Sequence, residues 1–149
     1  MKASCGYSWL EKTSSLRERN MGVLEGMCIT DARAKYGSDF RNIGEKKDSL
    51  VARVEEVWDG LIADAQEKGW KNLVVCTHGG VITAYINYLY TDRKYGLNRK
   101  LSPDSLKVPF NTSVLTIDIV LANKQGTIQD FGNTDHLGGH FTVKDQDLR

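Results

Sequence analysis

A histidine followed by two glycines, His78-Gly79-Gly80, is the part of the sequence best suited to chemistry. It follows Leu73–Thr77, a mostly apolar run typical of a buried strand, and precedes Val81–Tyr90, which has the pattern of a helix. Open α/β sheets bind ligands at the carboxyl ends of their strands, and the N–H groups at a helix start attract anions such as phosphate. The same residues also fit a hydrogen-bonded histidine beside an ordinary turn, and the local pattern does not separate the two interpretations.

Other kinds of chemistry are excluded by residue spacing. A cysteine phosphatase needs an arginine six residues after its cysteine, and that position after Cys76 holds Ile82. His136 and His140 are four residues apart, but the glycines between them favour a loop over a helix, which makes a metal site a poor interpretation. A phosphate-binding or dinucleotide-binding glycine motif is absent, as is a serine nucleophile elbow. We therefore expect neither a metal ion nor an organic cofactor.

Composition indicates an ordinary globular protein. The 149 residues suffice for one domain, and 40% hydrophobic with 26% charged residues excludes disordered, collagen-like and membrane classes. The net charge of +1 argues against nucleic-acid binding. No apolar run is long enough to cross a bilayer, and we expect no leader. Three cysteines without a pattern, Cys5, Cys28 and Cys76, indicate reduced thiols. We expect a cytoplasmic protein, with the nucleus as the alternative.

The first part of the chain predicts little regular structure. Leu16–Gly26 is too polar for a core strand and too rich in glycine for a helix, so we expect a short strand that runs into a loop. Thr30 is predicted to cap a short helix that ends before Gly37.

The strongest helix is predicted to start at Asp48 as its cap and to end at Gly69. Its apolar side chains recur at three- and four-residue spacings, with charged residues mostly between them. We expect this stripe to cover one face of a sheet that contains Leu73–Thr77.

The last third of the chain predicts a loop followed by a hairpin. Thr91–Leu106 is basic and polar, and its cations over Arg93–Lys100 suit either simple solvation or substrate contact. Ser113–Val120 and Thr127–Phe131 flank turn residues, which indicates an antiparallel hairpin. Asn133–His140 has the composition of a loop. Alternating strands and helices together predict an α/β domain with a mixed sheet.

Two of these segments resemble the histidine phosphatase superfamily, the phosphoglycerate mutase-like proteins. The matching stretches are Leu-Arg-Glu-Arg-Asn-Met-Gly-Val-Leu-Glu-Gly at 16–26 and Val-Cys-Thr-His-Gly-Gly-Val-Ile at 75–82. Weaker support comes from Gly44-Glu45, from Phe110–Val114 and from Asn133–Leu137, so the resemblance covers residues 16 to about 140 in order. It implies a three-layer α/β/α fold around a mixed sheet.

The resemblance also implies a mechanism. In the family one histidine attacks the phosphoryl group, and water then hydrolyses the phosphohistidine. His78 matches a second histidine, which stabilises charge on the phosphoryl group, and Glu18 matches the glutamate that protonates the leaving oxygen. Arg19 matches a substrate-contacting position of some members, and Gly79 would offer its N–H to the phosphate.

The sequence departs from the family at the nucleophile. The family carries it in an Arg-His-Gly motif on the first strand, but none of the three histidines here follows an arginine. We therefore expect residues 16–149 to form an incomplete phosphatase-like domain after a divergent segment, residues 1–15, with the first strand and its neighbouring elements missing. Thr83 stands where the family often has arginine.

Two functional hypotheses follow. The first is a phosphatase for phosphorylated small molecules, a phosphomonoester hydrolase whose sequence is truncated and inactive in this form. The second is a catalytically dead module that binds phosphorylated ligands or a protein. A sheet without its first strand would expose apolar surface, so we expect either that Met1–Trp9 fills the gap or that the chain self-associates there.

Overall fold

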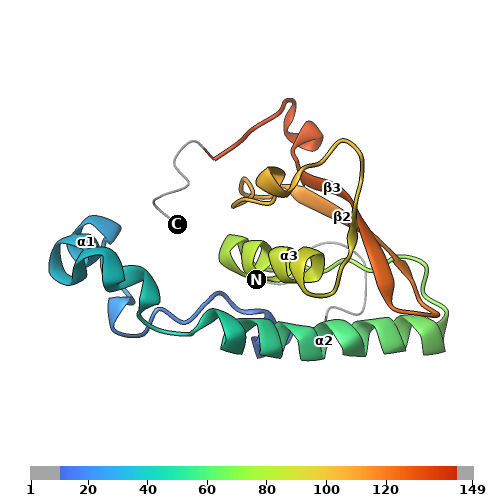
Figure 1. Ribbon diagram of the computed structural model, residues 1–149, viewed down its shortest axis with the longest axis horizontal. Helices are drawn as coiled ribbons and strands as arrows, with labels where there is room; N and C mark the ends of the chain where they lie inside the picture. The colour runs from blue at the N-terminus through green and yellow to red at the C-terminus, as the bar shows by residue number, and fades with distance from the viewer. Residues whose placement is uncertain (1–10, 144–149) are drawn as a thin grey trace.

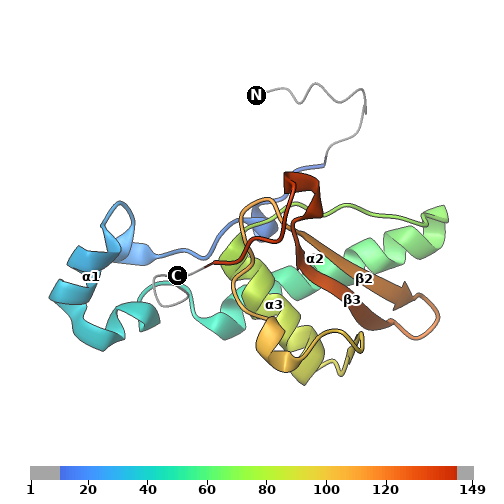
Figure 2. The same cartoon turned by 90° about the horizontal axis from the view of Figure 1, so that it is seen from above.

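Two helices and a β-hairpin make the main body of the protein in the computed structural model, which describes residues 11–143 (Figure 1). A third helix lies at one side of this body in both views (Figures 1 and 2). The helices are α1 (Ile29–Tyr36), α2 (Lys47–Lys68) and α3 (Gly79–Thr91), and the strands are β1 (Gly96–Leu97), β2 (Val114–Val120) and β3 (Gln125–Asn133). Among the described residues, no helix is long and apolar enough to cross a membrane.

The predicted helices are confirmed with small changes at their starts. α2 begins after Lys46 instead of Asp48, and α1 begins after Cys28 instead of Thr30. α2 ends where predicted, because Gly69 adopts the left-handed conformation at φ 67° that closes a helix.

The sheet is small and mixed, with strand order β1-β3-β2. β2 and β3 form the predicted antiparallel hairpin, with Ile117 opposite Ile128, and β1 pairs parallel to β3. The α/β class with a mixed sheet is therefore confirmed and is consistent with a phosphoglycerate mutase-like fold. The short strand β1 lies inside the segment that the sequence predicted as a loop throughout.

The core lies between α2, α3 and the hairpin. Ile128 at the centre of β3 is fully buried, as is Leu89 on α3. They pack with further buried side chains from both helices and from the loop after α3: Leu50, Val51, Val54, Val81, Tyr85, Ile86, Tyr95 and Leu106. A second, smaller cluster holds α1 in place through Leu24, Ala32 and Phe40.

The strand predicted at Leu73–Thr77 is wrong. This segment runs from the end of α2 to the start of α3 as irregular chain, and no strand among the described residues pairs with it (Figure 2). A strand forms only where a neighbour accepts its backbone hydrogen bonds. The stripe of α2 consequently packs against α3 and not against a sheet face at 73–77.

The strand predicted at the start of Leu16–Gly26 is also wrong. Two single-turn 3-10 helices, Ser14–Leu16 and Gly22–Leu24, stand in this part of the chain with irregular backbone between them. The proposed pairing of Met1–Trp9 lies outside the described residues.

Candidate functional site

Glu18 lies against the first turn of α3, the helix that begins directly after His78. Its Oε2 atom accepts a hydrogen bond from the backbone N–H of Gly80 at 3.3 Å, and its Oε1 atom accepts one from the N–H of Arg19 at 2.9 Å. A Cβ atom at position 80 would lie 2.7 Å from Glu18 Oε1, so a side chain there would displace the carboxylate. The structure thus brings together two segments that are 62 residues apart in the sequence.

His78 is the residue that precedes α3. Its extended backbone, at φ −110° and ψ 157°, places it at the N-cap, and its carbonyl accepts the N–H of Ile82 at 2.9 Å. The imidazole is exposed. Gly79, the first residue of the helix, is packed against Val108, and its carbonyl accepts the hydroxyl of Thr83 at 2.8 Å. The positive end of the helix dipole therefore faces the region between Glu18 and His78.

A second contact joins the two segments just beside this one. The Thr77 hydroxyl donates a hydrogen bond of 2.6 Å to the carbonyl of Leu16. The Thr13 side chain accepts the N–H of Ser15 at 3.2 Å and caps the 3-10 turn at Ser14–Leu16. The chain on both sides of Leu16 is therefore held close to the start of α3.

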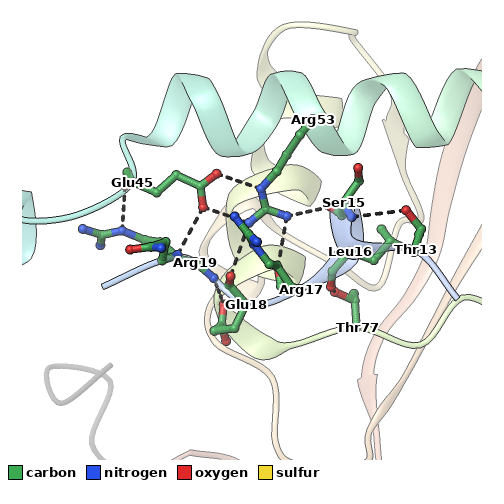
Figure 3. A network of polar contacts seen from close by, with 10 residues as sticks. Thr13, Ser15, Leu16, Arg17, Glu18, Arg19, Glu45, Arg53 and Thr77 are labelled. Carbon is green, nitrogen blue, oxygen red and sulfur yellow. Dashed lines mark hydrogen bonds and ion pairs between the residues drawn. The ribbon is translucent and has the colours of Figure 1, made fainter. Parts of the chain in front are cut away.

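The backbone around Glu18 is held from the other side by Arg53 of α2 (Figure 3). Arg53 donates to both carboxylate oxygens of Glu45, at 2.7 and 2.8 Å. It also donates to the carbonyls of Ser15, Arg17 and Glu18, at 2.6, 3.0 and 3.4 Å. The two side chains are largely buried, with 16% of Arg53 and 11% of Glu45 exposed.

This pairing changes the acid–base properties of both groups. Hydrogen bonds from Arg53 lower the pKa of Glu45, because they stabilise its ionised form, and the N–H of Asn20 adds to this effect. The carboxylate of Glu45 in turn raises the pKa of Arg53. Both groups are therefore charged at neutral pH.

Arg19 is bonded to the loop before α2. Its Nε atom donates to the carbonyl of Glu45 at 2.8 Å, and its Nη2 atom donates to the carbonyls of Arg41 and Ile43. In this arrangement the guanidinium holds the loop. The predicted contact of Arg19 with a substrate is not tested by this arrangement and stays a prediction.

Arg93 of the basic loop is engaged elsewhere. It is paired with Glu55 and Asp59 of α2, at 2.8 and 2.9 Å. Within residues 11–143, no group of three or more histidine, cysteine, aspartate or glutamate side chains is placed to hold a metal ion.

Comparison with known proteins identifies the family. The model of the histidine phosphatase superfamily (branch 1) matches residues 3–119. The chain belongs to the histidine phosphatase superfamily.

Two curated relatives agree with this assignment. A broad-specificity phosphatase of Saccharomyces cerevisiae is 42% identical over 142 residues, which are 92% of this chain and 58% of that protein. A probable phosphatase of Schizosaccharomyces pombe is 30% identical over 133 residues, 89% of this chain and 62% of that protein. The chain thus spans about three fifths of the length of these relatives. No solved structure matches.

Three residues of the site were missed by the sequence analysis. The sequence predicts for Arg53 only a place among the charged residues of the long helix, and for Thr77 the end of a strand. Glu45 is part of a weak motif. Only the pairing of Arg53 with Glu45 could have been found from the sequence, because the two residues are eight positions apart. The carbonyls that Arg53 binds lie 35 to 38 residues away.

Proposed function

We propose that this chain carries the proton-donor half of a phosphomonoester hydrolase site and binds the phosphoryl group of small phosphorylated molecules there. The observation that supports this most directly is the placement of the Glu18 carboxylate on the N–H of Gly80, two residues after His78 at the start of α3. An anion-binding helix start, a histidine and a carboxylate then lie within one exposed region.

Each group has a distinct task in this proposal. His78, when protonated, stabilises the charge on the transferring phosphoryl oxygens, and the N–H of Gly79 donates to one of them. Glu18 in its protonated form gives its proton to the leaving oxygen as the phosphorus–oxygen bond breaks. Arg19 contacts the substrate in this proposal, while in the structure its Nε and Nη2 atoms bind carbonyls of the loop before α2.

The nucleophile is the missing part of this site. No histidine of this chain follows an arginine, so the family route, in which an imidazole nitrogen forms a bond to phosphorus, has no matching residue here. We propose that the 149 residues bind phosphate but do not turn over substrate. The alternative is a binding module for phosphorylated ligands or proteins, and the same sequence observation favours it.

The test is hydrolysis of an aryl phosphate by the purified chain from acidic to neutral pH, together with phosphate binding followed by ³¹P NMR. We expect line broadening of inorganic phosphate that His78→Ala weakens, and no turnover. Turnover that disappears in His78→Ala would overturn the claim that the site is incomplete. Absence of both binding and turnover in a folded sample would overturn the phosphatase assignment itself.

We further infer that residues 16–149 act as one domain in the cytoplasm or nucleus. Cys28 and Cys76 are free and exposed thiols, which suits a reducing compartment. The remaining cysteine, Cys5, lies outside the described residues.

We also infer self-association through the segment 73–76. Leu73, Val74 and Val75 expose 39%, 88% and 37% of their surface, and an apolar segment without a strand partner invites pairing with a second copy. Val74→Lys should lower the mean mass in light scattering at high protein concentration without lowering stability, because Val74 is almost fully exposed. An original chain that is already monomeric at these concentrations would refute this inference.

A further inference from the structure

Arg53 is the residue that connects the largest helix with the segment carrying Glu18. Its guanidinium reaches three carbonyls of that segment, those of Ser15, Arg17 and Glu18 itself. Few side chains can do this, because only arginine presents five N–H donors in a planar fork. The carbonyl of Glu18 lies one covalent bond from the Cα atom that carries the carboxylate side chain.

Glu45 fixes the direction of this fork. Two hydrogen bonds from Arg53 to the two oxygens of Glu45 leave the guanidinium little freedom to rotate. Glu45 also accepts the N–H of Asn20, and its own N–H donates to the carbonyl of Asn20 at 2.7 Å. Both ends of the segment from Ser15 to Asn20 are therefore attached to the Arg53–Glu45 pair.

We propose that Arg53, oriented by Glu45, is the positioning residue that sets the place of the Glu18 carboxylate on α3. This inference deepens the proposed function and rests on it for its chemical meaning. A proton donor must lie within hydrogen-bond reach of the leaving oxygen, and small displacements of such a group cost much of the rate. Arg53 does not contact the substrate in this proposal.

Arg93 offers a matched comparison for this claim. Its side chain is 16% exposed, as is that of Arg53, and it pairs with carboxylates of α2, whereas Arg53 pairs with Glu45 just before that helix. It donates to the side chains of Glu55 and Asp59, whereas Arg53 donates to carbonyls of the 15–20 segment. Loss of either arginine should lower stability, but only the loss of Arg53 should move Glu18.

The experiment follows the backbone amide of Gly80 by NMR from about pH 6 to about pH 3, where carboxylates take up protons. This amide donates to Glu18, so its chemical shift should change as that carboxylate is protonated. The cations Arg17, Arg19 and Arg53, the carboxylate of Glu45 and the imidazole of His78 lie on the surrounding elements. Glu18→Gln is therefore the control: the shift change of Gly80 is assigned to Glu18 only if this substitution removes it.

Arg53→Lys keeps the charge but loses the fork, and we expect the amplitude of the Gly80 shift change to fall by about half or more. Arg93→Lys should leave that amplitude as it is in the original chain. Equal amplitudes in Arg53→Lys and the original chain would overturn the proposal, as would an equal loss in Arg93→Lys.

A second variant keeps the proposal testable where Arg53→Lys fails to fold. Glu45→Gln retains the size of the side chain and one acceptor, so this variant should fold. The amplitude of its Gly80 shift change should also fall, but by less than in Arg53→Lys. An unchanged titration in folded Glu45→Gln would count against the role of Glu45 in orienting Arg53. Phosphate binding is measured on the same samples. If the Gly80 shift change depends on Arg53 but the protein binds no phosphate, the proposed function is refuted and the positioning role of Arg53 stands.

Discussion

Arg53 and Arg93 each bind carboxylate side chains and are equally buried, but they are attached to different kinds of structure. Arg93, just after α3, binds Glu55 and Asp59, and Glu55 also accepts the hydroxyl of Tyr85. All these residues belong to the two packed helices or their ends. Arg53 instead binds Glu45 and an irregular stretch of backbone.

The difference between Arg93 and Arg53 is that polar contacts matter most where few apolar side chains hold the chain. α2 and α3 are already joined by buried apolar side chains, so Arg93 adds to an interface that exists without it. The 15–20 segment contributes only Leu16 to the border of that core, among the described residues. Its position therefore depends on hydrogen bonds from Arg53, Arg19 and Thr77.

The largest effect is expected from Gly44→Ala. Gly44 lies in the loop before α2, against Asn20 of the 15–20 segment, and a side chain there would push the two apart. Gly44 has a φ of 85°, and a Cβ atom there would lie 2.3 Å from the carbonyl oxygen of Asn20. The clash and the strained backbone should together lower the free energy of unfolding by about 3 kcal/mol, measured by urea denaturation.

Gly60→Ala is the matched control for that change. Gly60 lies inside α2, and a Cβ atom there would meet no atom within 4 Å. The free energy of unfolding should rise by roughly 0.5 to 1 kcal/mol, because alanine favours the helix. Equal effects of the two substitutions would show that the close approach at Gly44 is not important for the site segment.

A smaller effect is expected from Arg93→Met. The substitution leaves Glu55, whose side chain is 24% exposed, without its cation, and it should lower the free energy of unfolding by about 2 kcal/mol. The exposed Arg99 gives the control, since Arg99→Met should change stability by less than about 0.5 kcal/mol. The chemical shift of the Gly80 amide should stay unchanged in Arg93→Met. A change there would show that the contacts of Arg93 and those of Arg53 are coupled.

The smallest effect is a difference in pH dependence. The pKa of Glu45 is lowered in the folded state, chiefly by hydrogen bonds from Arg53. Its contribution to stability is therefore present above the ordinary value of 4.5 and is lost as the pH falls below that value through the folded pKa. Glu45→Gln should consequently be less stable than the original chain near neutral pH and lose less stability on acidification, which urea denaturation at both pH values measures. A stability difference that is the same at both pH values would contradict this.

The parts of the fold that the sequence predicted are those specified by nearby residues. The long helix follows from apolar spacings over 47–68 and from Gly69, and the hairpin follows from two alternating runs around a short turn. The segment 73–77 has the same apolar, partly β-branched composition as a strand. It forms none because pairing depends on a neighbour in space, which a local pattern does not encode.

The candidate site follows the same rule. Glu18 and His78 could be found from the sequence because each belongs to a motif, and the structure places their segments together. Arg53 could not be found, because a single arginine on the polar side of a helix is ordinary and its role depends on carbonyls of a distant segment. The pairing of Arg93 with Glu55 and Asp59 could not be found either, because these carboxylates lie 38 and 34 residues away in the sequence.

The hydrogen bonds of Thr77 with Leu16 and of Gly80 with Glu18 have a consequence for the order of folding. They close loops of 61 and 62 residues, whereas the β2–β3 turn joins Val120 to Gln125. Contacts with short loops form early because their closure costs less entropy. We therefore expect the hairpin and the helices to form first and the site last, so that changes at Thr77 or Arg53 mainly accelerate unfolding and leave the folding rate nearly unchanged.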